Sequence, residues 1–203
     1  MLLKIYPENP NPKALAQVVE CLSCGGIVIY PTDTVYAMGC DIRHPKTIER
    51  LARVKGVKAE KADFSILCND LSHLSEYTRP ISNPLFRLMK QSLPGPFTFI
   101  LPAGSQVPKL LHSRRKTVGI RVPDHPVLLE IIRELGSALI STSVKDDDQV
   151  LEYTTDPELI HDRYQQVVDL VVDGGFGHNV ASTVVDCTGD EPVIVRQGLG
   201  IVD

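Results

Sequence analysis

The chain has 203 residues, 43% of them apolar, which is enough to bury a core and most simply forms one domain spanning residues 1–203. Its net charge of −4 argues against a protein that wraps nucleic acid through its overall charge, so any role with RNA has to be local. The sequence has no apolar run of membrane-span length, no signal-peptide pattern and, with five scattered cysteines, no disulfide framework. We therefore expect a cytoplasmic protein with no membrane partner.

Apolar runs and helix-start signals predict alternating strands and helices at first and mainly strands later. We expect a strand ending at Tyr30 and further strands at Leu2–Tyr6, Phe64–Cys68, Phe97–Leu101, Thr117–Val122, Ala138–Ser143, Val167–Val172, Ser182–Asp186 and Pro192–Arg196. Helices are expected to start at Asn11-Pro12, His44-Pro45, Ser82 or Asn83, Asp124 and Asp156-Pro157. The pattern predicts one α/β or α+β domain, with a large twisted sheet of parallel and antiparallel strands and flanking helices.

Three polar residues, Thr32-Asp33-Thr34, follow the strand that Pro31 ends, and apolar residues lie on both sides of them. One interpretation is a turn closed by hydrogen bonds from side chains to the backbone. The other is a ligand site, because buried hydroxyls and a carboxylate need partners. Taken alone, three such residues favour the turn over the ligand site.

Hydroxyls and cations recur near the ends of other strands, at Thr117, Arg121, Ser141–Lys145, Ser182-Thr183 and Arg196. Arginine pairs with carboxylate or phosphate through two hydrogen bonds, and hydroxyl groups complete the shell around such an anion. Arg121 and Arg196 both stand within apolar strands, where an inward-facing charge needs an anionic partner. The set predicts one cleft for a ligand that carries phosphate and carboxylate groups.

The remaining sequence patterns give little information about function. The sequence lacks the GxxxxGK, GxGxxG, GxSxG and HExxH patterns, and its dispersed histidines predict no metal site. Two basic stretches, one with Lys55, Lys58 and Lys61 and one with Arg114-Arg115-Lys116, are typical of solvated loops and are at most a weak RNA-binding signal.

Seven motifs in register resemble the signatures of the YrdC/YciO family across nearly the whole chain. They are Gly26–Gly39, Pro94–Thr98, Thr117–Pro123, Ser141–Ser143, Asp173–Gly175, Ser182–Asp186 and Arg196–Gly198. The resemblance implies a twisted mixed sheet around a basic, concave cavity. It also implies a threonylcarbamoyl-AMP synthase type of enzyme, which joins L-threonine, bicarbonate and ATP, with Mg²⁺, and releases pyrophosphate for the t6A modification of tRNA.

Carried over by motif, the resemblance implies that Thr34, Arg121 and Thr183 hold threonine. It implies that Lys55, Thr117, Ser141, Ser143 and Arg196 face the nucleotide. No protein nucleophile is implied, so no residue is assigned as catalytic; the reaction needs positioning and charge neutralisation. We assign Asp33 to holding the turn, since a carboxylate facing the triphosphate would repel it unless a metal lay between them.

The sequence departs from the synthases at two places. Val57 stands where they carry the arginine of a Lys-x-Arg, and Lys145 stands where they carry the asparagine of a Ser-x-Asn. Both departures place the chain nearer the YciO branch. Two alternatives to synthesis therefore stay open: hydrolysis of threonylcarbamoyl-AMP or of threonylcarbamoylated RNA, and non-catalytic binding of tRNA or double-stranded RNA.

Overall fold

The computed structural model describes residues 1–111, 116–144 and 154–201. Its helices are α1 (Pro12–Ser23), α2 (Pro45–Val54), α3 (Leu71–Leu74), α4 (Asn83–Ser92), α5 (Pro126–Leu135) and α6 (Pro157–Tyr164), with 3-10 turns η1 (Ala59–Lys61) and η2 (Lys109–Leu111). Its strands are β1 (Leu2–Lys4), β2 (Val28–Tyr30), β3 (Ala37–Asp41), β4 (Ser65–Leu67), β5 (Phe97–Pro102), β6 (Thr117–Arg121), β7 (Leu139–Ser143), β8 (Leu170–Asp173), β9 (Thr183–Asp186) and β10 (Val193–Arg196).

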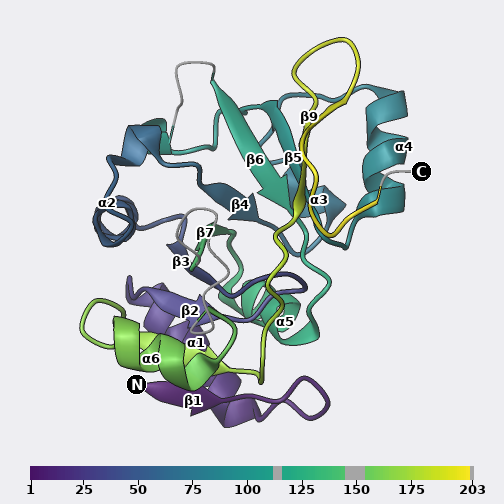
Figure 1. Cartoon of the computed structure of the whole chain (residues 1–203). Helices are drawn as coiled ribbons and strands as arrows, with labels where there is room; N and C mark the ends of the chain where they lie inside the picture. Colours follow the sequence, from purple (N-terminus) through teal and green to yellow (C-terminus); the bar gives the residue numbers. More distant parts are fainter. Residues whose placement is uncertain (112–115, 145–153, 202–203) are drawn as a thin grey trace.

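All these strands join one sheet in the order β1-β8-β2-β3-β7-β4-β6-β5-β9-β10. The pairs β1·β8, β2·β8, β4·β6 and β5·β9 are parallel and the others antiparallel. Figure 1 shows β5, β6 and β9 in the upper part of the molecule, and β1 with the amino terminus in the lower part. The mixed sheet confirms the predicted fold class.

The helix starts follow the sequence signals closely. The Asn11 side chain accepts a hydrogen bond from the Lys13 amide at 3.0 Å, and the Asp156 side chain accepts one from Glu158 at 2.9 Å. Each of these caps precedes a proline in the first turn, where the missing amide hydrogen costs nothing. α5 begins after His125, not at Asp124 as predicted, because the His125 side chain supplies the cap.

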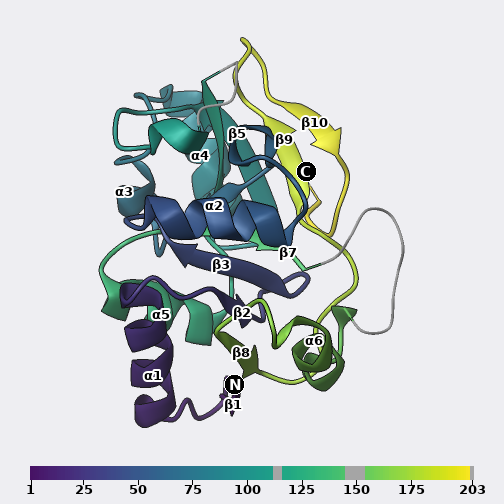
Figure 2. The same ribbon diagram turned by 90° about the vertical axis from the view of Figure 1, so that its left-hand side faces the viewer.

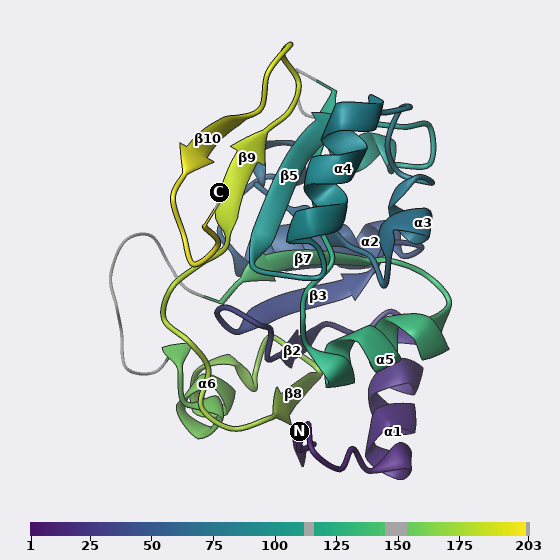
Figure 3. The same ribbon diagram turned by 90° about the vertical axis from the view of Figure 1, so that its right-hand side faces the viewer.

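Two apolar clusters fill the faces of the sheet. One contains Val118 and Ile120 of β6 and Ile140 of β7, and α2, α4 and α6 pack into it. The other contains Leu139 of β7 and Leu67 of β4, covered by α1 and α5. Figure 2 shows α2 across β3 and β7, and Figure 3 shows α1 beside α5.

The sequence analysis missed β3 and the short helix α3, and it misplaced two strand boundaries by two residues or more. β3 contains Gly39, a residue that weakens a strand prediction, but an added Cβ there would lie 2.3 Å from the Tyr30 hydroxyl. β1 ends at Lys4 instead of Tyr6. β8 starts at Leu170 instead of Val167, because the amides of Val167 and Val168 bond back to Tyr164 at the end of α6. None of the described helices is long and apolar enough to span a bilayer.

Candidate functional site

The turn after β2 is held by Thr32. Its hydroxyl accepts a hydrogen bond from the Thr34 amide at 3.0 Å and donates one to the Val35 carbonyl at 2.8 Å. Asp33, to which the sequence analysis gave this task, instead pairs with Arg121. The turn is thus a scaffold that leaves the Asp33 carboxylate for another role, and the prediction for Asp33 was wrong.

A Thr32→Val substitution should test this scaffold. It keeps the side-chain shape but leaves the Thr34 amide and the Val35 carbonyl buried without the partner they have. We expect the free energy of unfolding to fall by about 2 to 4 kcal/mol, measured by urea denaturation. The Thr32→Ser control retains the hydroxyl and should lose less than half as much; equal losses in both variants would contradict the assigned role.

Arg121 lies at the end of β6 and is only 8% exposed. Its guanidinium donates to Thr34 Oγ1 at 2.9 Å and to the Asp33 carboxylate. Burial lowers the pKa of the guanidinium, while the Asp33 charge opposes that shift and the nearby Arg196 adds to it. Arg196 therefore lies close enough to influence the buried ion pair of Arg121 and Asp33.

Two atoms of this ion pair have no hydrogen-bond partner among the described residues. They are Arg121 Nε, a donor, and Asp33 Oδ2, an acceptor, and both are buried. Buried polar atoms are almost always paired, and those left over often mark a site where something else binds. The pair can thus offer one donor and one acceptor to a small polar ligand.

The register of the sheet shows which predicted residues share a face with Arg121. Side chains alternate along a strand, so Thr117 and Gly119 lie on the face opposite Val118 and Ile120. Ser65 of β4 and Ser141 of β7 align with Gly119 across the sheet. Since Leu139 belongs to the other cluster, Ser141 and Ser143 share the face of Arg121.

Hydroxyl groups line this face. Ser141 is buried and accepts a hydrogen bond from the Tyr30 hydroxyl at 2.9 Å; burial raises the pKa of Tyr30, which stays protonated as the donor. Thr98 of β5 bonds to Ser182 at 2.8 Å. An added Cβ on Gly119 would lie 3.1 Å from Ser65 Oγ and 3.3 Å from the Thr98 methyl carbon, so a side chain there would crowd both residues. The sequence analysis missed Tyr30, Ser65 and Thr98, because each stands next to apolar residues in its strand and none of them carries a charge.

Thr183 does not join this face. It lies two residues before Val185, which belongs to the cluster on the opposite face, and its hydroxyl donates to the Gly200 carbonyl at 2.6 Å. The same hydroxyl accepts from the Gly198 amide at 2.9 Å and from Gln197. One donor and two acceptor positions are all that a hydroxyl has, so Thr183 holds the C-terminal segment in this structure.

Arg196 is exposed at the end of the edge strand β10, whereas the sequence analysis expected an inward-facing charge. Its guanidinium donates to the Ser182 carbonyl at 2.9 and 3.2 Å. A β-bulge between Ile194 and Arg196 shifts the register, so that Arg196 pairs with Val184. Because β10 is an edge strand, Arg196 remains accessible to a ligand at the rim of the Arg121 face.

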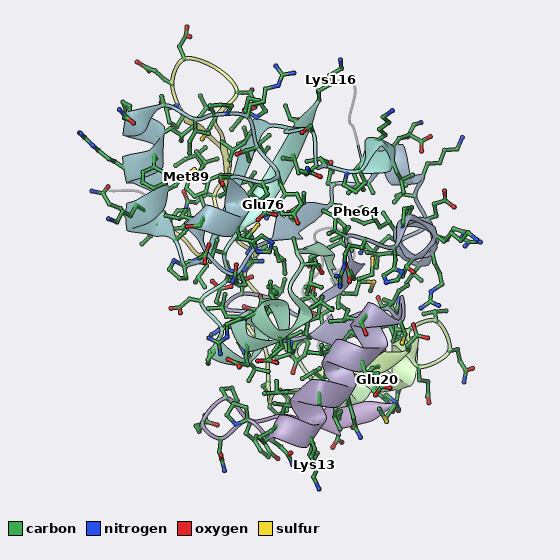
Figure 4. The ribbon with its side chains drawn as sticks, turned by 180° about the vertical axis from the view of Figure 1, so that it is seen from behind. Lys13, Glu20, Phe64, Glu76, Met89 and Lys116 are labelled. Atoms are coloured by element: carbon green, nitrogen blue, oxygen red, sulfur yellow. The ribbon has the colours of Figure 1, made fainter. Side chains whose placement is uncertain are left out.

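The other predicted cations of the described residues follow α2 or precede β6. Lys55 follows α2 and is half-buried, and Lys58, Lys61 and Lys116 are exposed. η1, which ends at Lys61, packs against η2, which carries Lys109, a basic residue that the sequence analysis did not select. Figure 4 places Lys116 at the opposite end of the molecule from Lys13. Arg114, Arg115 and Lys145 lie outside the described residues.

Two cavities among the described residues lie away from these side chains. One of about 430 Å³ is lined by Ile42, Arg43, Glu76, Tyr77, Gln106 and Pro108, and one of about 510 Å³ lies at Lys4–Pro12. The basic, concave cavity expected over the Arg121 face stays a prediction.

Comparison with known proteins identifies the family. A family model described as "Telomere recombination" (Sua5_yciO_yrdC) matches residues 20–198, most of the chain. The chain belongs to the Sua5/YciO/YrdC family. It is 42% identical to a protein named YciO of Escherichia coli K12 over 98% of this chain and 95% of that protein. The crystal structure of E. coli YciO superposes with a TM-score of 0.92 at 39% identity, covering 99% of this chain and 97% of that one.

More distant members of the Sua5/YciO/YrdC family carry a named activity. A threonylcarbamoyl-AMP synthase of Bacillus subtilis is 31% identical over 94% of this chain, which spans 55% of that enzyme's length. The crystal structure of Pyrococcus abyssi "Sua5 complexed with L-threonine" superposes with a TM-score of 0.88 at 24% identity, over 98% of this chain and 57% of that one. The chain is thus more similar to YciO than to these synthases, as the two departures in its sequence predict.

Proposed function

We propose that this protein binds L-threonine, or the threonylcarbamoyl group made from it, at Asp33, Thr34 and Arg121. The observation that carries the proposal is the pair of unpartnered buried atoms, Arg121 Nε and Asp33 Oδ2. A bound amino acid offers a carboxylate oxygen for the first and an N–H group for the second. The threonine complex of P. abyssi Sua5, which shares the fold, supports the same choice of ligand.

The reaction that follows is the synthesis of threonylcarbamoyl-AMP. The threonine nitrogen forms a bond to the carbon of bicarbonate, with loss of water, and gives a carbamate. A carbamate oxygen then attacks the α-phosphorus of ATP, and the bond from that phosphorus to pyrophosphate breaks. Arg121 would hold the threonine carboxylate, and Asp33 would accept the N–H hydrogen bond, which fixes the direction of the nitrogen.

The nucleotide would lie along the hydroxyl-lined face toward Arg196. Ser141, Ser143 and Thr117 share that face, and Arg196 and Lys55 would supply charge to the phosphates. The proposal assigns Mg²⁺ to the phosphate oxygens, because Mg²⁺ is usually bound through substrate phosphates and a few carboxylates. The role of the protein is then to orient two substrates and to balance charge.

The proposal is tested by titration calorimetry with L-threonine and by release of pyrophosphate from ATP. We expect binding of L-threonine by the unmodified protein and none by Arg121→Met, with valine as the ligand control that lacks the hydroxyl. Pyrophosphate release should require threonine and bicarbonate together. Failure to bind threonine, or release that is independent of it, would refute the proposed function.

Hydrolysis is a second candidate function, and Val57 favours it. Val57 is 42% exposed at the position where the synthases carry an arginine, so one contact to phosphate is missing. Loss of a hydrogen bond to a charged group costs about 1.5 to 3 kcal/mol. The same threonine site could then serve removal of the threonylcarbamoyl group from AMP or from RNA. Incubation with threonylcarbamoylated tRNA, followed by nucleoside analysis, separates this candidate from synthesis.

A further inference from the structure

Hydrogen bonds hold a short loop after β8 beside the turn that follows β2 and contains Thr34. Residues 174–178 make five hydrogen bonds. Two involve the Tyr36 hydroxyl, which accepts from Gly174 N at 3.2 Å and donates to Gly175 O at 2.7 Å. The others run from Gly175 N to Asp173 Oδ1 at 3.0 Å, from Gly177 N to Thr155 O at 2.8 Å and from His178 N to Thr34 O at 3.1 Å. Glycine is required here, since a Cβ on Gly177 would lie 2.6 Å from the Tyr36 ring and Gly175 has a φ of +90°. The loop is therefore rigid.

Phe176, at the centre of this rigid loop, is 80% exposed, the highest exposure of any large apolar side chain in the described residues. A scattered surface apolar residue needs no explanation, but this one is held outward by a loop that is packed on both sides of it. Its sequence neighbours, Gly175 and Gly177, have no side chains, so neither covers a face of the ring. A planar group can thus stack on the ring with little loss of conformational entropy in the loop.

The position of Phe176 relates it to the candidate site. It is two residues from His178, whose amide bonds to Thr34, and two residues span at most about 7 Å. The other end of the same segment, Ser182, accepts the hydrogen bonds of Arg196. Residues 174–182 include no Asp or Glu, so the segment that carries the ring adds no negative charge that would repel an anionic ligand.

We propose that Phe176 is the stacking platform for the nucleobase of the ligand whose polar end enters the Asp33–Arg121 pair. This inference rests on the proposed function and adds the residue that recognises the base. The base belongs either to a mononucleotide or to a nucleotide within RNA; both present the same planar surface to the ring. Stacking of a base on an aromatic side chain typically raises affinity by about five- to a hundred-fold.

The test uses the absence of tryptophan from the chain. Phe176→Trp introduces one fluorophore at the proposed platform, and Phe86→Trp introduces one at a control position on α4 that is 43% exposed. Each variant is titrated with AMP, with a single-stranded oligoribonucleotide and with ribose 5-phosphate, which lacks a base. Phe176→Ala is titrated with the same probes by calorimetry, and L-threonine is titrated separately.

We expect AMP or the oligoribonucleotide to quench the fluorescence of Phe176→Trp, while ribose 5-phosphate leaves it unchanged and Phe86→Trp responds to none of them. Quenching by AMP identifies a mononucleotide, and quenching by the oligoribonucleotide alone identifies an RNA base. Phe176→Ala should lose about five- to a hundred-fold in affinity for the quenching probe and keep its affinity for threonine. No quenching, or equal quenching by ribose 5-phosphate or in Phe86→Trp, would overturn the proposal. Quenching without any threonine binding would support the platform and refute the proposed function alone.

Discussion

An Arg121→Met substitution is expected to lower the free energy of unfolding by about 3 to 5 kcal/mol, measured by urea denaturation. Methionine fills much of the arginine volume, but the Asp33 carboxylate is then left buried without its cation. Truncating one partner of a buried ion pair costs more than the pair is worth, because the remaining charge has lost both water and partner. Threonine binding should be lost as well.

The control for this variant is the double substitution Asp33→Asn with Arg121→Met, which removes both charges. We expect it to recover at least half of the lost stability, since an amide is far cheaper to bury than a carboxylate. Threonine binding should not recover, because the guanidinium is still absent. A double variant as unstable as Arg121→Met would show that packing, and not the unpaired charge, sets the cost.

A Gly198→Ala substitution is the second change with a large expected effect. Its Cβ would lie 2.2 Å from the Ala181 carbonyl oxygen and 2.5 Å from that of Ser182, so the backbone has to move. Overpacking against backbone costs about 3 kcal/mol, and the displaced strand end would separate Arg196 from Ser182. We expect lower stability in urea denaturation and weaker binding of ATP, with threonine binding retained.

Gly189→Ala is the matched control. An added Cβ there would lie 4.0 Å from the Glu191 carbonyl oxygen, and Gly189 lies in the turn between β9 and β10. Its stability and ATP affinity should stay close to those of the unmodified protein. If Gly198→Ala behaves like Gly189→Ala, the C-terminal segment does not position Arg196.

Local signals in the sequence were sufficient for most of the fold. Cap-proline pairs such as Asn11-Pro12 and Asp156-Pro157 mark helix starts through one or two residues, so they can be read without tertiary contacts. β3 could not be read in this way. Gly39 makes sense only beside Tyr30 and Ile140, which approach it from other strands.

The candidate site was predicted only in part, because its residues meet through tertiary contacts. Arg121 was selected because a charge within an apolar strand needs a partner, and Asp33 is that partner. The sequence did not identify the partner, since the two residues are 88 positions apart. Thr183 was selected from its motif, but which face a residue occupies depends on the register of β9 against β5, which a motif does not encode.

The ion pair of Asp33 and Arg121 carries no net charge, and this affects which molecules can enter. A zwitterion such as an amino acid brings its own positive and negative groups, so its arrival leaves the buried charge of the pair unchanged. A simple carboxylic acid would add an uncompensated negative charge next to Asp33, which costs energy in a buried location. Under the proposed function, we therefore expect the pair to select dipolar molecules by charge balance, independently of any contact with a side-chain hydroxyl.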